Sequence, residues 1–356
     1  MATLDGTRVL VTGGAGFIGS HTVDALVEGG SDVVVLDSLR PDRHDGPPEH
    51  LNRRATYDHG DVTDGDAWRR AARGADAICH LAGQVGLGVD FADVCDYVHH
   101  NDTGAAVGLL ALHEIGFRGR FVLASSMVVY GEGAYRCPEH GSVRAGPRRR
   151  ADLDAGRFEP PCPTCGAPLE PEMVTEDAPL DPRNVYAATK AHQEHLAAAF
   201  GREHGVAVTA LRYHNVYGPR MPKDTPYAGV AAVFASELGA GRAPMVYEDG
   251  RQTRDFVHVR DAAAANVVAL TRDEPVSGAF NVASGQPRTV GELAEVMADA
   301  FGAGAPRPRV VGGARSGDVR HVFASPARAH DVLGFTAAVP FAQGVSDLVT
   351  NLTARR

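Results

Sequence analysis

A glycine-rich turn between an apolar run and a helical pattern constrains the fold of this chain more than any other feature. Residues 8–12 are mostly apolar and rich in valine, and the motif Gly-Gly-Ala-Gly-Phe-Ile-Gly follows at residues 13–19. A helical pattern over residues 20–28 leads to a second valine-rich run, residues 32–36. Glycines at this spacing permit a tight turn, close approach of a pyrophosphate, and packing of the helix on the strand. The segment predicts a βαβ unit that binds a dinucleotide through Gly13, Gly16, Phe17, Ile18 and Gly19.

An acidic residue follows the second predicted strand. Asp37 lies 18 residues after Gly19. A carboxylate at this position can accept hydrogen bonds from both ribose hydroxyls and would repel a 2′-phosphate, so NAD is expected rather than NADP. Arg40 and Arg43 lie nearby, and we interpret them as part of a solvated loop.

The strand and helix pattern continues through the first half of the chain. Residues 56–59, 77–81 and 121–125 are predicted strands, and residues 90–115 supply helical material between the last two. Strands that alternate with helices form a parallel sheet covered on both faces. The expected fold class is therefore α/β, a Rossmann doubly wound parallel sheet, with its ligand beyond the carboxyl ends of the strands.

Composition sets the remaining limits. The 356 residues are 44% hydrophobic and carry a formal net charge of −9. This length allows a domain of about 180 residues and a smaller one. The negative charge argues against nucleic-acid and membrane-surface binding, because such proteins normally present a basic face. No uninterrupted apolar stretch approaches the roughly 18 residues of a membrane span, and no signal-peptide pattern precedes residue 10, so a cytoplasmic location is expected.

A tyrosine and a lysine one helical turn apart indicate proton-transfer chemistry. Lys190 lies four residues after Tyr186 in the motif Tyr-Ala-Ala-Thr-Lys, so both side chains share a helix face. A phenol has a pKa of about 10 in water, and nearby positive charge would lower it. Ser126, at the end of a predicted strand, can hydrogen-bond the same substrate oxygen. The three residues are the predicted catalytic group.

Together these motifs resemble the extended short-chain dehydrogenase/reductase family, in its nucleotide-sugar epimerase/dehydratase branch. The similarity runs from residue 8 to about residue 335 and includes His-Leu-Ala-Gly at 80–83, Arg-Tyr-His-Asn-Val-Tyr-Gly-Pro at 212–219 and Arg-Asp-Phe-Val-His-Val at 254–259. It implies a homodimer that binds a nucleotide-diphosphate sugar, and it implies two further sets of binding residues. For NAD these are Asp61, Val62, Leu81, Ala82, Gly83, Asn101, Ser125, Tyr186, Lys190 and His214; for the substrate they are Ser126, Asn215, Arg254, Arg315 and Asp318.

The resemblance also implies a domain division. Residues 1–215 are expected to form the NAD-binding domain, and residues 216–356 to form mainly a smaller C-terminal substrate-binding domain. Residues 252–286 are expected to return to the first domain. The paired helices of a dimer are expected within residues 90–115 and 186–204.

The residues after Ser126 narrow the reaction. Related 4,6-dehydratases carry an Asp-Glu pair where this chain has Met127 and Val128, and related decarboxylases carry a glutamate at the second position. Neither residue here can exchange a proton, which leaves 4-epimerisation, favoured by the NAD preference, or simple keto reduction. Residues 220–230 and the cysteine-bearing insert resemble bacterial dTDP-L-rhamnose 4-epimerases. UDP-glucose/galactose or UDP-glucuronate 4-epimerisation is the alternative, and a non-catalytic NAD or nucleotide-sugar sensor is the alternative from another class.

A cysteine-bearing insert separates Ser126 from Tyr186. The chain has five cysteines, and three of them lie in Cys-x-x-His at 137–140 and Cys-x-x-Cys at 162–165. Two such pairs can complete a tetrahedron around zinc, and four protein ligands would make the site structural. Residues 137–170 are therefore a predicted zinc-ribbon-like insert, a lid or rim over the substrate, whose arginine run at 144–150 we interpret as a solvated face. The metal ligands would be Cys137, His140, Cys162 and Cys165, while Cys79 and Cys95 are expected in the core.

Overall fold

The computed structural model describes residues 6–40, 46, 48–86, 91–222, 229–314 and 318–354. Arg43 and Arg315, both singled out by the sequence, lie outside the described residues, as do residues 223–228 of the segment that resembles the rhamnose 4-epimerases.

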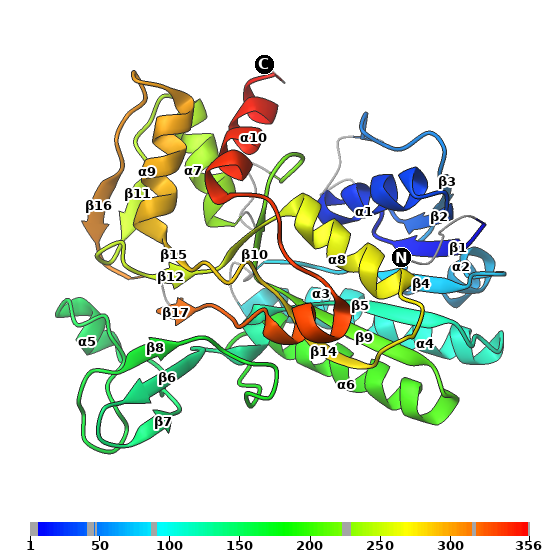
Figure 1. Ribbon diagram of the computed structural model, residues 1–356, viewed down its shortest axis with the longest axis horizontal. Coiled ribbons are helices and arrows are strands. Elements are labelled where there is room, and N and C mark those ends of the chain that lie inside the picture. The colour runs from blue at the N-terminus through cyan, green and yellow to red at the C-terminus, as the bar shows by residue number, and fades with distance from the viewer. Residues whose placement is uncertain are drawn as a thin grey trace.

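A seven-stranded sheet forms the centre of the molecule (Figure 1). Every neighbouring pair of its strands is parallel. The order β14-β9-β5-β4-β1-β2-β3 changes direction between β1 and β4, which creates a crevice at their carboxyl ends. The predicted doubly wound parallel sheet is confirmed. Its strands are β1 (Arg8–Thr12), β2 (Asp32–Asp37), β3 (Thr56–His59), β4 (Ala77–His80), β5 (Arg120–Ser126), β9 (Ala207–Tyr213) and β14 (Gly278–Val282).

Helices cover both faces of this sheet, as the apolar side chains of the strands require. Val9 and Val11 of β1 belong to one hydrophobic cluster, and Leu10 between them belongs to another, because successive side chains of a strand point to opposite faces. The first cluster lies under α1 (Phe17–Glu28) and α8 (Val259–Thr271), and the second under α2 (Gly65–Ala71), α4 (Gly104–Glu114) and α6 (Val185–His204).

The helical segment expected at residues 90–115 is interrupted. It contains the 3-10 turn η1 (Phe91–Asp93), α3 (Val94–Tyr97), the π-helical turn η2 (Val98–Thr103) and then α4. Such π turns inside α-helices are frequent at functional sites. Cys79 is buried in β4 as expected, but Cys95 is exposed. That expectation was wrong because α3 presents this side chain to solvent and not to the sheet.

The C-terminal elements have a hydrophobic cluster of their own. Figure 1 places its helices beside one another, away from the large sheet. By contrast, α8 packs on one face of the large sheet, and β14 is the edge strand of that sheet. The elements around this cluster are α7 (Val230–Gly239), α9 (Val290–Phe301), α10 (Phe341–Thr353), the pair β10 (Asn215–Tyr217) and β13 (Phe256–His258), the pair β11 (Met245–Tyr247) and β16 (Arg309–Gly312), and the trio β12 (Thr253–Arg254), β15 (Arg288–Thr289) and β17 (His321–Val322).

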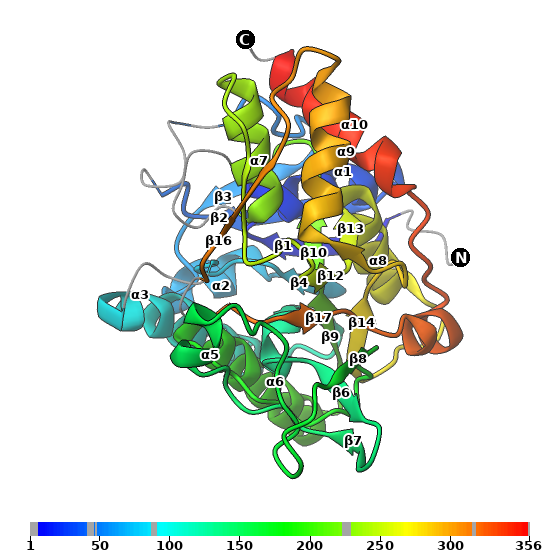
Figure 2. The same ribbon diagram turned by 90° about the vertical axis from the view of Figure 1, so that its left-hand side faces the viewer.

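The insert is a small body at the opposite side of the molecule from α10 (Figures 1 and 2). It follows the 3-10 turn η3 (Met127–Tyr130), and its three antiparallel strands have the order β7-β6-β8. Its few buried apolar side chains include two cysteines, Cys137 and Cys162. The strands are β6 (Ala134–Cys137), β7 (Gly141–Val143) and β8 (Glu170–Glu172), and a short helix α5 (Arg150–Asp154) lies between β7 and β8.

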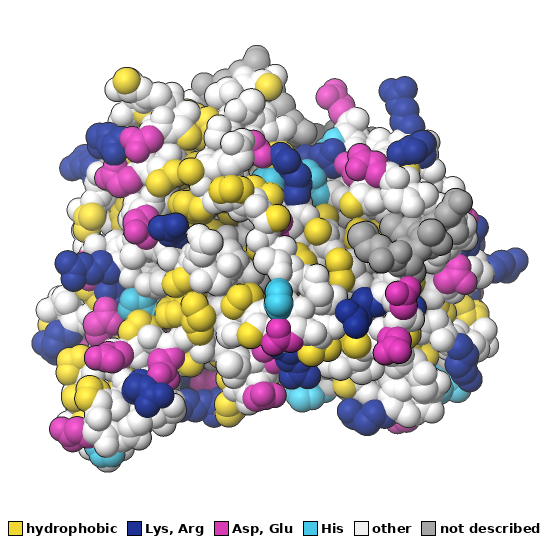
Figure 3. Space-filling view, in the orientation of Figure 1, with side chains coloured by type: hydrophobic (Ala, Val, Ile, Leu, Met, Phe, Trp, Pro, Cys, Tyr) yellow, Lys and Arg dark blue, Asp and Glu magenta, His cyan; other side chains and the backbone are white. Residues whose placement is uncertain are grey.

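The surface is mixed in charge. Positive and negative side chains are interspersed over the face in Figure 3. Within the described ranges, no helix combines the length and apolar character that crossing a bilayer requires. One further helical element, the π-helical turn η4 (Ala329–Leu333), precedes α10 in the chain.

Candidate active site

One continuous cavity of about 880 Å³ lies at the carboxyl edge of the large sheet. Strand ends form one side of it, at Gly13 after β1, Asp37 of β2, Leu81 after β4 and Ser126 of β5. Segments of the C-terminal elements, including Arg254, form the other side. The position is the one expected for a ligand of a doubly wound sheet.

The glycine turn has the geometry that a bound pyrophosphate needs. Gly13 has a φ of +70°, and a Cβ there would lie 2.7 Å from the backbone nitrogen of Ala82. A Cβ on Gly19 would lie 2.1 Å from the carbonyl oxygen of Gly13. The turn can therefore contain only glycine at these positions, and it leads into α1, whose N-terminal amides favour an anion. All five residues predicted here, Gly13, Gly16, Phe17, Ile18 and Gly19, line the cavity.

Asp37 lies at the end of β2 beside this turn. Its carboxylate accepts hydrogen bonds from the backbone N–H groups of Ala15 and Leu39, each at 2.9 Å. Arg40 also lines the cavity, but its guanidinium pairs with Asp96 and contacts His100. The fixed carboxylate and the engaged arginine both fit a ribose with free hydroxyls better than one with a 2′-phosphate.

Most of the remaining cofactor-end residues lie where the sequence predicts them. Asp61, Val62, Leu81, Ala82, Gly83 and Ser125 line the cavity. Asn101 does not. It is fully buried behind the wall, where its amide accepts from the backbone N–H of Gln84 and donates to the Gln84 carbonyl and to Thr189. Asn101 therefore holds the segment after β4 against α6 and does not itself line the cavity.

The predicted catalytic residues lie together on the cavity wall. Asn184 caps α6 by accepting a hydrogen bond from the backbone N–H of Ala187 at 2.8 Å. This cap starts the helix at Val185 and so places Tyr186 in its first turn. Lys190 lies one turn later, donates to the Ala124 carbonyl at 3.0 Å, and has its Nζ 6.0 Å from the centre of the Tyr186 ring. All three of Ser126, Tyr186 and Lys190 line the cavity.

Burial dominates the acid–base behaviour of this pair. It raises the pKa of Tyr186 to about 12, and the hydrogen bond with Ser126 offsets this only in part. It also lowers the pKa of Lys190 to about 8. Both pKa changes arise because burial disfavours the charged form of each group, the phenolate of Tyr186 and the ammonium of Lys190. The protein's own groups therefore do not produce the lowered tyrosine pKa that the motif suggests, because the loss of hydration outweighs the favourable contacts.

Two polar side chains of the segment after β9 line the cavity and carry unpaired buried atoms, as far as the described part of the chain shows. The two ring nitrogens of His214 and the Oδ1 atom of Asn215 are buried and form no hydrogen bond with any described residue. Burial lowers the pKa of His214 to about 3, while the nearby Asn281 raises it in part. The imidazole is therefore neutral at physiological pH. Buried polar atoms normally have partners, so both side chains are suited to a ligand in this cavity.

At the far end of the cavity, Arg254 and Asp318 lie where the sequence predicts substrate contacts. Arg254 donates to the carbonyl groups of Thr253, Val319 and Arg320 at 2.9, 2.7 and 2.9 Å. These bonds fix the guanidinium while leaving other N–H groups of the fork for an anionic ligand.

Several cavity residues were not predicted from the sequence. Arg183 and Asn184 precede the Tyr-x-x-x-Lys helix, and a cation so close to the tyrosine is a signal that could have been used. Gly131 follows η3. Tyr247 and Gln252 flank the turn after β11 and reach the cavity through tertiary packing alone. No local pattern marks those two residues.

The insert brings its four predicted ligands together outside the cavity wall. One ligand atom from each of Cys137, His140, Cys162 and Cys165 lies within 4.8 Å of all the others. The Cys137 sulfur is 3.4 Å from Nδ1 of His140 and 3.7 Å from the Cys165 sulfur, and the Cys162 sulfur is 3.7 Å from the same Nδ1. A tetrahedron with Zn–S bonds of about 2.3 Å has edges of roughly 3.7 Å. The donor set and its spacing fit zinc.

The chain has similarity to characterised proteins along nearly its whole length. A profile of the NAD dependent epimerase/dehydratase family matches residues 9–151 and 162–283. The unmatched residues 152–161 fall inside the insert; they begin within α5 and end directly before Cys162. The family profile therefore follows the large sheet and part of the insert.

Individual relatives share this extent. The dTDP-L-rhamnose 4-epimerase of Burkholderia thailandensis is 33% identical over 98% of this chain and 95% of its own length. Two solved structures have a TM-score of 0.78 over 98% of this chain. One is the Thermus thermophilus UDP-glucose 4-epimerase in complex with NAD, 30% identical and covered over 100% of its length, and the other is the Thermotoga maritima UDP-glucose 4-epimerase with UDP-glucose, 28% identical and covered over 99%.

Proposed function

The chain belongs to the NAD-dependent epimerase/dehydratase family, and on that premise we propose that it is an NAD-dependent nucleotide-sugar 4-epimerase. We propose further that its substrate pair is dTDP-L-rhamnose and dTDP-6-deoxy-L-talose. The single observation that carries the reaction type is the cavity itself. It joins the glycine turn to Ser126 and Tyr186, and the two residues after Ser126 on its wall, Met127 and Val128, have no acid or base.

The cofactor would lie in the part of the cavity formed by the glycine turn and Asp37, which is called the cofactor end. The glycine turn and the N-terminus of α1 would hold its pyrophosphate, and Asp37 would accept from the adenosine ribose. NAD bound there supplies a reversible hydride acceptor for the C4 carbon of the sugar.

The chain's own residues handle the proton. Ser126 hydrogen-bonds the C4 hydroxyl and aligns it with Tyr186. The Tyr186 phenolate would take the C4 hydroxyl proton as the bound cofactor supplies the hydride acceptor, which would leave a keto sugar. Tyr186 would return the same proton to the oxygen when the carbonyl, presented by its opposite face, is reduced again. No net proton or electron is lost, so the reaction needs no second acid or base beside Tyr186.

Protonated Lys190 stabilises the phenolate. Its Nζ already donates to the Ala124 carbonyl, which fixes the cation beneath the Tyr186 ring. A cation held at this distance favours the charged form of the tyrosine. Because burial raises the pKa of Tyr186, the positive charge of bound NAD would have to favour the phenolate further.

The side chains after Ser126 disfavour the neighbouring reactions. A 4,6-dehydratase must remove a proton at C5 and protonate a leaving hydroxyl at C6, and a decarboxylase of this family uses a glutamate at the second position. Met127 and Val128 both line the cavity and neither titrates. Their apolar surface suits the methyl group of a 6-deoxy sugar, which supports the rhamnose substrate.

A UDP-sugar 4-epimerase is the second candidate. The Thermus thermophilus UDP-glucose 4-epimerase is nearly as similar as the Burkholderia thailandensis protein, at 30% against 33% identity. The reaction steps would be the same, and only the base and the sugar would differ. A keto-sugar reductase or a sensor would retain the fold without catalysing isomerisation.

We also propose the assembly around this site. Cys137, His140, Cys162 and Cys165 would hold a structural zinc ion, because their donor atoms already have near-tetrahedral spacing. Residues 1–215 would form the NAD-binding domain and residues 216–356 mainly the substrate-binding domain, with 252–286 returning to the first. Two chains would pair through the helices at 90–115 and 186–204, where Leu110 of α4 is 56% exposed.

The test is incubation of the purified protein with dTDP-L-rhamnose, without added cofactor, followed by proton NMR of the sugar ring. The proposal expects a C4 epimer to form without net NADH. Tyr186→Phe should lose turnover by about 1,000-fold or more, because the base is removed, while it still binds nucleotide. Epimerisation of UDP-glucose alone would select the second candidate. Turnover only of keto sugars with added NADPH would make the protein a reductase.

A further inference from the structure

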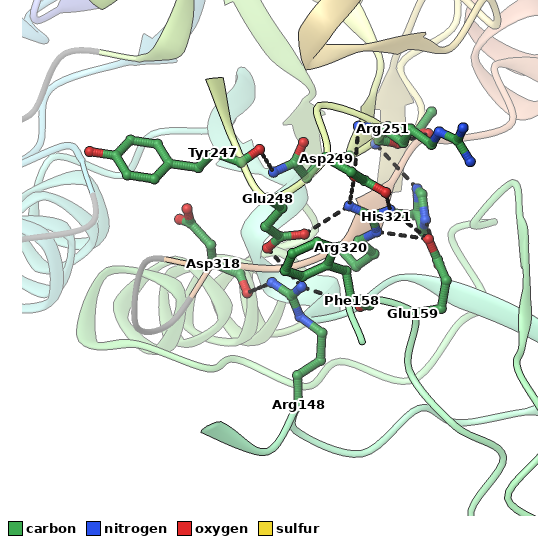
Figure 4. A network of polar contacts seen from close by, with 12 residues as sticks. Arg148, Phe158, Glu159, Tyr247, Glu248, Asp249, Arg251, Asp318, Arg320 and His321 are labelled. Carbon is green, nitrogen blue, oxygen red and sulfur yellow. Dashed lines mark hydrogen bonds and ion pairs between the residues drawn. The ribbon is translucent and has the colours of Figure 1, made fainter. Parts of the chain in front are cut away.

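One arginine of the insert is buried, although the sequence suggests that the whole arginine run is solvated. The side chain of Arg148 is only 4% exposed, whereas those of Arg149 and Arg150 are 75% and 68% exposed. The exposed pair makes local ion pairs with Asp152 and Asp154. Arg148 instead extends out of the insert toward the C-terminal elements (Figure 4). The solvated interpretation was therefore wrong for Arg148, because its neighbours in space come from distant parts of the chain.

The guanidinium of Arg148 joins three segments. It donates to Oε1 of Glu248 at 2.8 Å, to the backbone carbonyl of Asp318 at 2.6 Å, and to the carbonyl of Phe158 within the insert at 3.4 Å. The Glu132 carboxylate lies 3.7 Å away. A planar fork that bridges two elements in this way fixes their separation, which a flexible ammonium group could not do.

Glu248 extends this connection to the turn after β11. It is buried, and its φ of +54° is uncommon for a residue with a side chain. Its second carboxylate oxygen accepts from Arg320 at 2.8 Å, and Arg320 in turn pairs with Glu159 of the insert. Such a backbone conformation persists only where the surroundings hold it. The two arginines therefore help to hold the turn, together with its backbone hydrogen bonds, and its flanking residues Tyr247 and Gln252 line the cavity.

The segment that Arg148 holds is also a wall of the cavity. Asp318 and Val319 line it, and Arg254 donates to the carbonyl groups of Val319 and Arg320 from the cavity side. Residues 318–320 thus lie between two guanidinium groups, one from the insert and one at the substrate end. A displacement of this segment would move Arg254 with it.

The insert reaches the cavity at a second place. Arg183, on the cavity wall three residues before Tyr186, donates to the carbonyl of Ala145 at 3.1 Å. Ala145 is buried in the same small cluster as Cys137 and Cys162. The cysteine cluster, the arm at residues 145–148 and the cavity wall are therefore in direct contact.

We propose that Arg148 is a positioning residue for nucleotide-sugar binding, through which the insert holds the wall that carries Arg254 and Asp318 in place. This inference rests on the proposed function, since it assigns the diphosphate to that wall. In this proposal the insert contributes directly to the architecture of the substrate site. The insert acts on binding and leaves the glycine turn and the Tyr186 chemistry unchanged.

The test compares Arg148→Met with the matched control Arg150→Met, both in the NAD-loaded protein. Titration calorimetry with dTDP and with UDP measures binding of the diphosphate end without any sugar chemistry. Whichever of dTDP and UDP the wild type binds, Arg148→Met is expected to lower the affinity for that nucleotide by about tenfold or more. Arg150→Met is expected to leave that affinity unchanged. Bound NAD, measured by absorbance after denaturation, should be equal in all three proteins. In turnover assays the loss should appear in KM, with kcat changed by less than about twofold.

A conservative variant separates positioning from folding. Arg148→Lys keeps the positive charge opposite Glu248 but lacks the fork that also reaches the Asp318 carbonyl, so it should fold normally and recover only part of the affinity. Full affinity in both Arg148→Met and Arg148→Lys would overturn the inference while leaving the epimerase proposal intact. A wild-type protein that binds neither dTDP nor UDP would overturn the nucleotide-sugar assignment and the inference together.

Discussion

The two ends of the cavity are constructed in different ways. At the cofactor end, Gly13, Asp37 and Leu81 lie at or just after strand ends, so each is positioned by its own segment. At the substrate end, Arg254 and Asp318 are held by contacts with residues far away in the sequence, including Arg148. The first end depends on backbone geometry, and the second depends on a buried network of charges.

This difference predicts different sensitivities. Backbone geometry tolerates no Cβ where the turn is tight but needs no distant partner. A buried charge network tolerates shape changes but not the loss of one partner, because the remaining charges stay desolvated. Changes at one end should therefore leave the other end intact.

Removal of the bridging carboxylate should have the largest effect. Glu248→Ala leaves Arg148 and Arg320 facing each other without the acid between them. We expect a loss of about 3–5 kcal/mol in unfolding free energy by urea titration. Glu248→Gln, which keeps the shape and one acceptor, should lose less. Equal stability of the alanine variant and the wild type would show that the network does not hold the substrate end.

A methyl group in the glycine turn should break the cofactor end. In Gly19→Ala the new Cβ would lie 2.1 Å from the Gly13 carbonyl oxygen, so the turn must shift. We expect NAD affinity to fall by about 100-fold, or about 2.7 kcal/mol. Equilibrium dialysis with NAD measures this, and Gly146→Ala in the insert, where a Cβ meets nothing within 4 Å, is the control. Loss of dTDP binding in Gly19→Ala at saturating NAD would contradict the separation of the two ends.

Metal removal should loosen the substrate end alone. If zinc joins the four ligands, chelation with phenanthroline should lower the local opening free energy of the insert by about 2 kcal/mol, less than in isolated zinc fingers because the arginine network also holds it. Hydrogen exchange should then accelerate in β6 and β7 but stay unchanged in β1 and β2. If exchange is identical before and after chelation, although the metal content has changed, zinc does not stabilise the substrate end.

The smallest predicted effect concerns His214, which lies between the two ends. Its pKa is about 3 in the folded protein, below the usual 6.5 of the unfolded chain. Since the unfolded state binds the extra proton between these values, stability falls as pH decreases below about 6.5. His214→Phe removes this penalty, so between about pH 7.5 and 5.5 the variant should gain about 1.4 kcal/mol relative to the wild type. Parallel stability curves would show that the imidazole protonates in the folded protein.

Sequence patterns predicted the large sheet and the cofactor end in detail. The strand at residues 56–59 was predicted with the observed bounds, β4 ends one residue before its predicted end, and β5 is one residue longer than predicted at each end. The edge strand β14 and its neighbour β9 were not predicted as strands. The cavity wall contains Gly13, Asp37, Ser126, Tyr186 and Lys190 as expected. These residues could be found because turns, strand ends and one-turn helix spacings are local features of the backbone.

Prediction failed where a role depends on burial by distant segments. Arg148 and Arg150 have the same side chain, but only Arg148 is buried against Glu248 and Asp318. Asn101 was expected beside the cofactor, yet the π-helical turn η2 directs it to the backbone of Gln84 behind the wall. Tyr247 and Gln252 reach the cavity through tertiary packing of the turn after β11, which pairs with β16 and contacts Arg148 and Arg320 through Glu248.

The chain alone was enough to predict the glycine turn, the alternation of strands and helices up to β5, the Tyr186–Lys190 spacing and the spacing of the four potential metal ligands. Steric limits and periodicity act over a few residues, so they can be read from the chain directly. Only the tertiary structure decided which arginine is buried, which carboxylate bridges it, and how the insert meets the substrate end. Those outcomes depend on desolvation and on charges brought together from positions 148, 248 and 320, and no short stretch of sequence contains that information.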